Sequence, residues 1–168
     1  MSDSQEIVFL PIDLERHLDE VVRNRLDSFV SSFGEEKGRA AFYGPDGDGV
    51  AKYIDWLKAK MAIDPYLAVH AWQGDRIIGQ MELGTLKTDS SVGYVNLYYL
   101  IPEFRGTGVS KALDDYAVRY LKSKGHKTAR LAVSPTNSRA LRYYTRMGWA
   151  DLGQRADAPE LNWMEKSF

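Results

Sequence analysis

Several features that the sequence lacks exclude whole classes of protein. Its 168 residues include no cysteine, which excludes disulfides, a thiolate nucleophile and cysteine-type zinc sites. No apolar run is long enough to predict a membrane span. The first six residues, Met-Ser-Asp-Ser-Gln-Glu, have neither a basic region nor a hydrophobic segment, so we expect no signal peptide. The three histidines, His17, His70 and His126, are scattered without metal-ligand spacing, and no metal site is predicted.

Charge of one sign is also missing overall. The formal net charge is −1, which argues against a protein that coats nucleic acid or an acidic membrane. Residues 101–150 nevertheless carry ten basic residues against three acidic ones. Such a segment is typical of a locally bound anionic ligand and equally of a solvated helix face. We expect a cytoplasmic protein that forms a single domain over residues 1–168.

The hydrophobic periodicity predicts a mixed α/β or α+β fold. A strand–helix–strand crossover over 91–134 favours a parallel strand pair, whereas a hairpin over 66–86 favours antiparallel pairing elsewhere. We predict strands at 6–12, 66–72, 76–86, 91–101, 128–134 and 160–168, helices from Asp13 to about Ser32 and at 50–61, 109–125 and 137–148, and a loop at 43–49.

A glycine-bearing loop, Arg105-Gly106-Thr107-Gly108, lies between the strand at 91–101 and the following helix. The first amides of a helix lack intrahelical partners, and glycines let a phosphate approach them closely. Arg105, Lys111 and the Ser110 hydroxyl would add charge and a donor, which suits a pyrophosphate. The spacings of a P-loop and of a dinucleotide-binding fingerprint are both absent. Taken alone, the loop is compatible with a simple turn.

Two linked segments carry a resemblance to a known family. The first is LYYLIPEFRGTGVSKAL at 97–113, and the second combines Asn137, Ala140, Tyr144 and Gly148-Trp149. Together they resemble the signature segments of the GCN5-related N-acetyltransferases, the GNAT superfamily. Ser110 stands where the family usually has a smaller residue. The close resemblance covers residues 91–150, and the N-terminal third resembles the family in element order only.

The resemblance implies a fold and a cofactor. The fold would be the GNAT fold, a mixed and mostly antiparallel sheet of about six or seven strands with about four flanking helices and a splayed parallel pair. The cofactor would be acetyl-CoA. Its pantetheine arm would pair with the strand that ends in Tyr98, Tyr99 and Leu100. The implied pyrophosphate site comprises Arg105, Gly106, Thr107, Gly108, Val109, Ser110 and Lys111, and Asn137 is a further candidate for cofactor binding.

The resemblance also implies catalytic roles. Tyr144 would donate a proton to the CoA sulfur, and the N–H of Leu100 or a neighbour would stabilise the developing oxyanion. Without cysteine there is no Cys-linked acyl-enzyme, which favours direct attack by the amine in a ternary complex. Glu82 is the candidate base, and an outward-facing glutamate on a half-exposed strand is the alternative. Tyr144 lies on an apolar helix face, where a tyrosine usually belongs to the core. The family's other carboxylate position is Ala132 here.

The acceptor would be a small-molecule or peptide amine. We expect its specificity to come from residues 29–56, where aromatics and Glu35, Glu36, Asp46 and Asp48 could recognise a cationic amine; ordinary core aromatics beside a surface loop are the alternative. The rival function is a non-catalytic acyl-CoA-binding or regulatory GNAT-like module. No aromatic–basic motif predicts nucleic-acid binding, no membrane partner is expected, and a homodimer stays open.

Overall fold

The computed structural model describes residues 6–168 and contains one seven-stranded sheet with the strand order β1-β2-β3-β4-β5-β7-β6. Residues 1–5, which make up most of the segment on which the signal-peptide prediction rests, lie outside the described residues. The strands are β1 (Ile7–Pro11), β2 (Ala68–Gln73), β3 (Arg76–Leu86), β4 (Asp89–Leu100), β5 (Thr128–Val133), β6 (Ala150–Gln154) and β7 (Asn162–Ser167), and the helices are α1 (Leu18–Phe33), α2 (Glu35–Tyr43), α3 (Gly49–Ile63), α4 (Ser110–Ser123) and α5 (Ser138–Arg146). No helix within residues 6–168 has the length and apolarity that crossing a bilayer requires.

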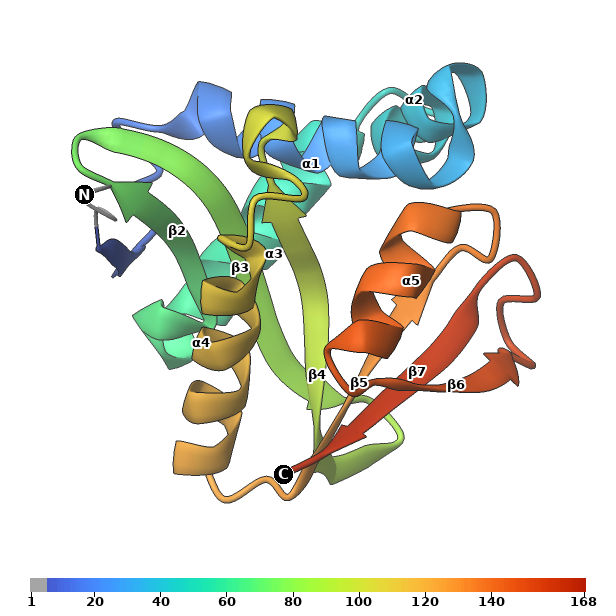
Figure 1. Ribbon diagram of the computed structural model, residues 1–168. Helices are drawn as coiled ribbons and strands as arrows, with labels where there is room; N and C mark the ends of the chain where they lie inside the picture. Colours follow the sequence, from blue (N-terminus) through green and yellow to red (C-terminus); the bar gives the residue numbers. More distant parts are fainter. Residues whose placement is uncertain (1–5) are drawn as a thin grey trace.

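The parallel pair in the middle of the sheet is short. β4 and β5 pair only at Gly93–Ala129, Tyr94–Arg130 and Val95–Leu131, although both strands continue further. All other neighbouring strands pair antiparallel. Beyond Val95 the two strands separate, and Figure 1 shows β4 and β5 diverging below α1 and α5. The predicted mixed, mostly antiparallel sheet with a splayed parallel pair is therefore confirmed.

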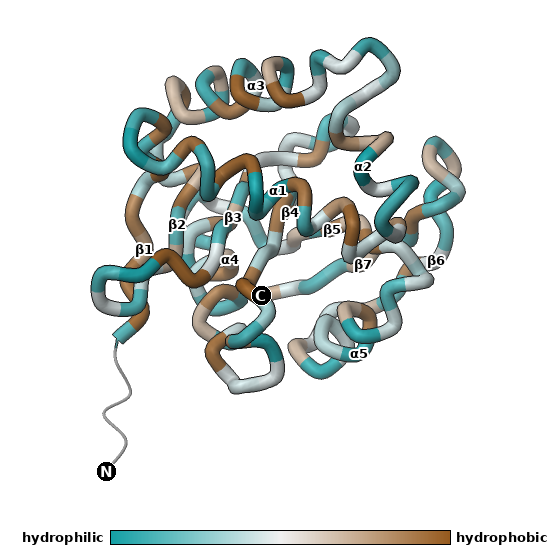
Figure 2. Tube along the Cα trace, turned by 90° about the horizontal axis from the view of Figure 1, so that it is seen from above, coloured by the Kyte–Doolittle hydropathy of each residue, from teal (hydrophilic) through white to brown (hydrophobic). Residues whose placement is uncertain are grey.

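Helices cover both faces of this sheet. α1, α2 and α3 pack on one face around Val21, Phe42, Tyr53 and Leu57. α4 and α5 pack on the other face, where the apolar stripe predicted for 109–125 is buried and includes Leu113, Tyr116, Ala117 and Leu121. In the view of Figure 2 the strands form a row, with α3 on one side and α5 on the other. The two cores together place the gap between β4 and β5 at the centre of the molecule.

The structure differs from the prediction in two missed elements and one helix boundary. The segment 35–43, left without a helix in the sequence analysis, forms α2, which makes five helices rather than about four. A Cβ at Gly38 would lie 2.6 Å from the Phe29 carbonyl oxygen, so this glycine allows α2 to pack directly on α1. The edge strand β6 was not predicted, because its side chains are mostly exposed and lack apolar alternation. Asp13 accepts hydrogen bonds from the amides of Glu15 and Arg16 in a turn, and α1 itself begins at Leu18.

α1 runs across the wide end of the gap and contacts both of its sides. On the β4 side, Asp27 accepts hydrogen bonds from the Tyr99 hydroxyl at 2.6 Å and from Arg105 at 2.9 Å. On the β5 side, the hydroxyl of Thr136 donates to the Ser32 carbonyl at 3.3 Å. The C-terminal half of α1 thus closes one mouth of the gap (Figure 1).

Candidate active site

The loop before α4 presents unpaired backbone amides. Gly106 and Gly108 have φ values of 77° and 88°, a region that favours glycine. Within the described part of the chain, the N–H groups of Gly106, Gly108, Val109 and Ser110 donate to no protein acceptor. Nothing lies within 4 Å of a Cβ built at Gly108. Four amides around an open space at the positive end of a helix form a cradle suited to a phosphate.

Three polar side chains of this loop and of the first turn of α4 bond to other groups of the protein. Arg105 Nε donates to the Leu100 carbonyl at 2.8 Å, and its guanidinium pairs with Asp27 on α1. Lys111 pairs with Asp115 at 2.9 Å, with both side chains exposed. The Thr107 hydroxyl donates to the Phe104 carbonyl at 2.5 Å. The cradle therefore depends on backbone amides, and Arg105 fixes the loop to β4 and α1.

One edge of β4 is open toward the gap. The Ile101 amide donates to the Ile78 carbonyl on β3 at 2.9 Å, so Tyr99 and Ile101 direct their backbone groups toward β3. Polar groups alternate along a strand, and those of Tyr98 and Leu100 therefore point toward β5. The Leu100 carbonyl is taken by Arg105, which leaves the Leu100 N–H and both backbone groups of Tyr98 at the open edge. An extended ligand can pair there as a strand would.

Three tyrosines gather where β4, α4 and α5 meet. The hydroxyls of Tyr98 and Tyr143 lie within hydrogen-bond distance of each other and of the Ser110 carbonyl, which is 2.6 Å from the first and 2.8 Å from the second. These contacts hold the first turn of α4 in place. The ring of Tyr144 lies 5.5 Å from that of Tyr98 and 6.3 Å from that of Trp149.

The hydroxyl of Tyr144 is the free one of the three. Within residues 6–168 it makes no hydrogen bond, whereas the hydroxyl of Tyr143 is engaged at α4. Burial, and then the neighbouring Tyr143, raise the pKa of Tyr144 above its ordinary value, so it stays protonated at neutral pH. A protonated, partnerless hydroxyl beside β4 can donate to a ligand in the gap.

Asn137 caps α5, as its position predicts. Its Oδ1 accepts the Ala140 amide at 3.2 Å, and its own amide donates to the Ser134 carbonyl at 3.0 Å. The side-chain oxygen is therefore committed to the helix. Its role in cofactor binding remains a prediction.

Glu82 is fully buried on the face covered by α1 and α3, so the outward-facing alternative is wrong. Its Oε2 accepts hydrogen bonds from the Tyr53 hydroxyl and from Gln80 Nε2, the latter at 3.0 Å. Its Oε1 lies 3.3 Å from Arg25 Nη1 but accepts no hydrogen bond from any residue between 6 and 168. Burial, followed by the charge of Glu82, raises the pKa of Tyr53 far above its ordinary value. Glu82 thus keeps one oxygen with spare accepting capacity.

Arg25 and Lys60 connect Glu82 to the point where the strands separate. Arg25 Nη1 donates to the Asn96 carbonyl at 3.2 Å, and Lys60 Nζ donates to Asn96 Oδ1 at 3.2 Å. Asn96 follows Val95, the last residue of β4 that pairs with β5. Burial lowers the pKa of Lys60. Glu82 and its partners therefore lie close to the apex of the gap.

A pocket of about 310 Å³ lies between α1, α2 and α3 and reaches this cluster. Its inner wall includes Arg25 and Tyr53, the two residues that contact Glu82. Its lining residues are Arg25, Phe29, Ala41, Phe42, Gly44, Pro45, Asp48, Gly49, Lys52, Tyr53 and Trp56. All belong to the segment predicted to determine acceptor specificity, except Arg25.

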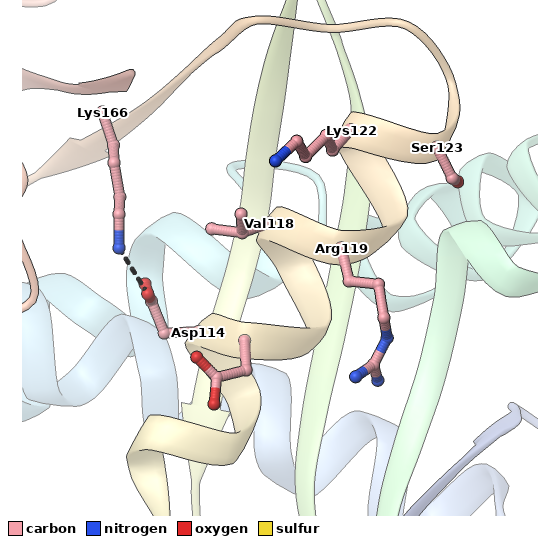
Figure 3. Close-up of a pocket in the computed structure, with 7 residues that line it drawn as sticks. Asp114, Val118, Arg119, Lys122, Ser123 and Lys166 are labelled. Carbon is pink, nitrogen blue, oxygen red and sulfur yellow. Dashed lines mark hydrogen bonds and ion pairs between the residues drawn. The ribbon is translucent and has the colours of Figure 1, made fainter. Parts of the chain in front are cut away.

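A larger groove of about 540 Å³ lies away from the gap, on the outer side of α4 (Figure 3). Its principal polar feature is an ion pair between Lys166 and the buried Asp114 at 2.7 Å. Asp114 also accepts a hydrogen bond from Trp149 Nε1 at 2.9 Å, and Lys166 donates to the Met147 carbonyl at 2.6 Å. These groups satisfy one another's charge and hydrogen-bonding capacity and link α4 to β7. We therefore assign them to the stability of the fold and not to a binding site.

The comparisons with known proteins agree with this geometry. The sequence model described as the Acetyltransferase (GNAT) family matches residues 28–149. The chain belongs to the GNAT acetyltransferase family. That match spans both the amide cradle and the open edge of β4.

Curated relatives of this GNAT protein include a mycothiol acetyltransferase of Actinosynnema mirum, 37% identical over 57% of this chain and 30% of the relative. An uncharacterized N-acetyltransferase of Archaeoglobus fulgidus is 40% identical over 32% of this chain and 36% of the relative. The chain thus spans about a third of the length of these relatives.

Solved structures share the GNAT fold over nearly the whole chain. The PaiA N-acetyltransferase of Thermoplasma acidophilum, in complex with coenzyme A, aligns with a TM-score of 0.66 at 20% identity, covering 97% of this chain and 99% of that one. An acetyltransferase of Thermus thermophilus aligns with a TM-score of 0.71 at 17% identity, covering 96% of this chain and 97% of that one.

Sequence reasoning missed part of this GNAT site. Arg25, Tyr53 and Lys60 were not singled out. Tyr53, Leu57 and Lys60 recur at helical spacing in the helix predicted at 50–61, which indicates one shared face. Nothing local in the sequence indicates that this face packs over Glu82.

Proposed function

We propose that the protein transfers an acetyl group from acetyl-CoA to a primary amine by direct attack in a ternary complex. The observation that carries the proposal is the amide cradle at Gly106–Ser110 placed beside the open edge of β4. A phosphate site followed by a free strand edge fits a ligand with a pyrophosphate at one end and an extended arm. Membership of the GNAT family and the coenzyme A complex of the Thermoplasma relative support this assignment.

The fit of this chain to the cofactor rests on its backbone. The amides of Gly106, Gly108, Val109 and Ser110 would bind the pyrophosphate, and the open groups of Tyr98 and Leu100 would orient the arm. Bound acetyl-CoA would supply an activated thioester with a good leaving group. The Leu100 N–H would donate to the acetyl oxygen as negative charge develops there, a contribution of about 3–4 kcal/mol for a preorganised donor.

Two side chains would move protons. Glu82, through the free lone pairs of Oε1, would take the proton that the amine loses as its nitrogen bonds to the acetyl carbon. As the carbon–sulfur bond breaks, the Tyr144 hydroxyl would donate to the sulfur, so that an amide and a free thiol result. Arg25 would hold Glu82 in position through their contact at 3.3 Å.

The deciding experiment compares Tyr144→Phe with Tyr120→Phe. Tyr120 is half-buried and donates to Asp64 away from the gap, so its variant controls for loss of a tyrosine hydroxyl elsewhere in the fold. We expect Tyr144→Phe to lower kcat about 100-fold or more while the Kd for CoA stays unchanged. CoA binding is measured by calorimetry, and thiol release is measured over a panel of amines.

The outcomes separate the two functions. Tight CoA binding without turnover on any amine would favour a non-catalytic acyl-CoA-binding module. A well-folded protein that binds no CoA would refute the cofactor assignment.

A further inference from the structure

The pocket between α1, α2 and α3 is rich in rings whose neighbours are cations of the protein itself. The guanidinium carbon of Arg25 lies 5.3 Å from the ring centre of Phe29 and 5.4 Å from that of Tyr53. Lys60 Nζ lies 4.9 Å from the ring centre of Trp56. Three of the pocket's four rings therefore already hold a cation–π partner, which lowers their attraction for a cationic substrate.

The charges around the inner end of the pocket also disfavour a substrate with several positive charges. Arg25 lines the pocket, and the ammonium of Lys60, which does not line it, bonds to the same Asn96 as Arg25 does. The carboxylate of Glu82 lies 3.3 Å from Arg25. At the mouth, Asp48 is paired with Lys52 at 3.2 Å and contributes no surplus negative charge. Glu35, which the sequence analysis considered for cation recognition, pairs with Arg39 on the exposed side of α2. The cluster of Arg25, Lys60 and Glu82 at the inner end of the pocket thus carries a net positive charge.

Shape and exposure complete the description. The volume of about 310 Å³ is at the lower end for small-molecule sites and leaves room for one small ligand. Phe42 and Tyr53 are buried, whereas Trp56 is 39% exposed and offers an accessible apolar surface on the pocket. A flat apolar group can pack on Trp56 in a pocket whose wall also includes Arg25 and Tyr53, the two lining residues that contact Glu82.

We propose that this pocket selects an aromatic primary amine with a single positive charge, and discriminates against polyamines and aminoglycosides. The single amine of the substrate would lose its proton to Glu82. Its aromatic part would displace water from the rings that line the pocket. A second ammonium in the pocket would be repelled by Arg25 on its wall and by Lys60 beyond that wall, at an energetic cost that grows in a partly buried site. The selection rests on the proposed acetyltransferase function, because it names that site's acceptor class.

Phenethylamine and spermidine are the probes. With acetyl-CoA saturating, we expect kcat/KM for phenethylamine to exceed that for spermidine at least tenfold. Trp56→Ala should lower kcat/KM for phenethylamine at least fivefold, mainly through KM, and leave the value for spermidine unchanged. Lys58→Ala, an exposed substitution on the same helix that does not line the pocket, is the control and should alter neither.

Direct binding of each amine to the CoA-saturated protein, measured by calorimetry, supplies a second readout. Tighter binding of phenethylamine that Trp56→Ala weakens supports the inference even if neither probe is acetylated. Equal or better use of spermidine overturns the inference, while its acetylation leaves the acetyltransferase function standing. If CoA itself does not bind, the proposed function fails, and titration of the two amines into the free protein still tests the pocket.

Discussion

Two glycines with the same strained backbone allow the amide cradle to be tested against its own structural cost. Gly108 has φ of 88° and Gly125, at the end of α4, has φ of 91°. Nothing lies within 4 Å of a Cβ built at either position. Substitution by alanine therefore introduces the same backbone strain at both sites, about 1–2 kcal/mol in the free energy of unfolding.

The two variants should differ only in cofactor binding. Gly108 is itself one of the four residues with free amides, so a Cβ there adds bulk at the cradle, whereas Gly125 lies at the other end of the helix. Displacing a phosphate from one charge-assisted hydrogen bond removes about 1.5–3 kcal/mol. That loss corresponds to a Kd for CoA that is about 10- to 100-fold higher for Gly108→Ala. Gly125→Ala should bind CoA as the wild type does.

Two measurements on both variants and the wild type check this prediction. Calorimetric titration gives the Kd for CoA, and urea denaturation gives the free energy of unfolding. Equal CoA affinity in all three proteins would refute the cradle. A large loss of stability in Gly108→Ala but not in Gly125→Ala would show that the loop has a packing role absent from the geometry described above.

Two further predictions concern stability. Lys166→Met leaves the carboxylate of Asp114 buried without its ion-pair partner, and urea denaturation should show a loss of about 3–5 kcal/mol, whereas the exposed Lys58→Met should cost little. Burial lowers the pKa of His70 to about 4, so the folded state favours its neutral form. The free energy of unfolding is therefore at its full value above the ordinary pKa near 6.5. It decreases as the pH drops toward 4, by at most about 3 kcal/mol. His70→Gln should flatten this part of the stability–pH curve, and an unchanged slope would place the titration elsewhere.

Elements with strong local signals were predicted correctly from the sequence. The stripe on α4, the hairpin of β2 and β3 and the cap at Asn137 each follow from neighbouring residues. α2 was missed because Gly38 suggests a loop, although its lack of a side chain serves close packing on α1. The edge strand β6 has no apolar alternation to detect.

The candidate site likewise combines residues with a local sequence signal and residues without one. The glycine loop and Tyr144 were singled out because two short motifs resemble those of the GNAT family, and their catalytic and binding roles stay predictions. The burial of Glu82 could not be predicted, since its partners Arg25 and Tyr53 come from two separate helices. The outward turn of Arg105 toward Asp27 likewise depends on a residue far away in the sequence.

The separation of β4 from β5 also has a consequence for what the molecule excludes. It exposes strand edges in the interior, and unpaired edges elsewhere invite association with foreign chains. Here Asp27 and Ser32 of α1 are bonded across the mouth of the gap, to Arg105 on one side and Thr136 on the other. The free edge of β4 therefore lies in the middle of the sheet, with α1 across one mouth of the gap, and not at the border of the sheet. An edge in this position is less accessible to a foreign strand than an edge at the border of a sheet, although it can still pair with an extended ligand.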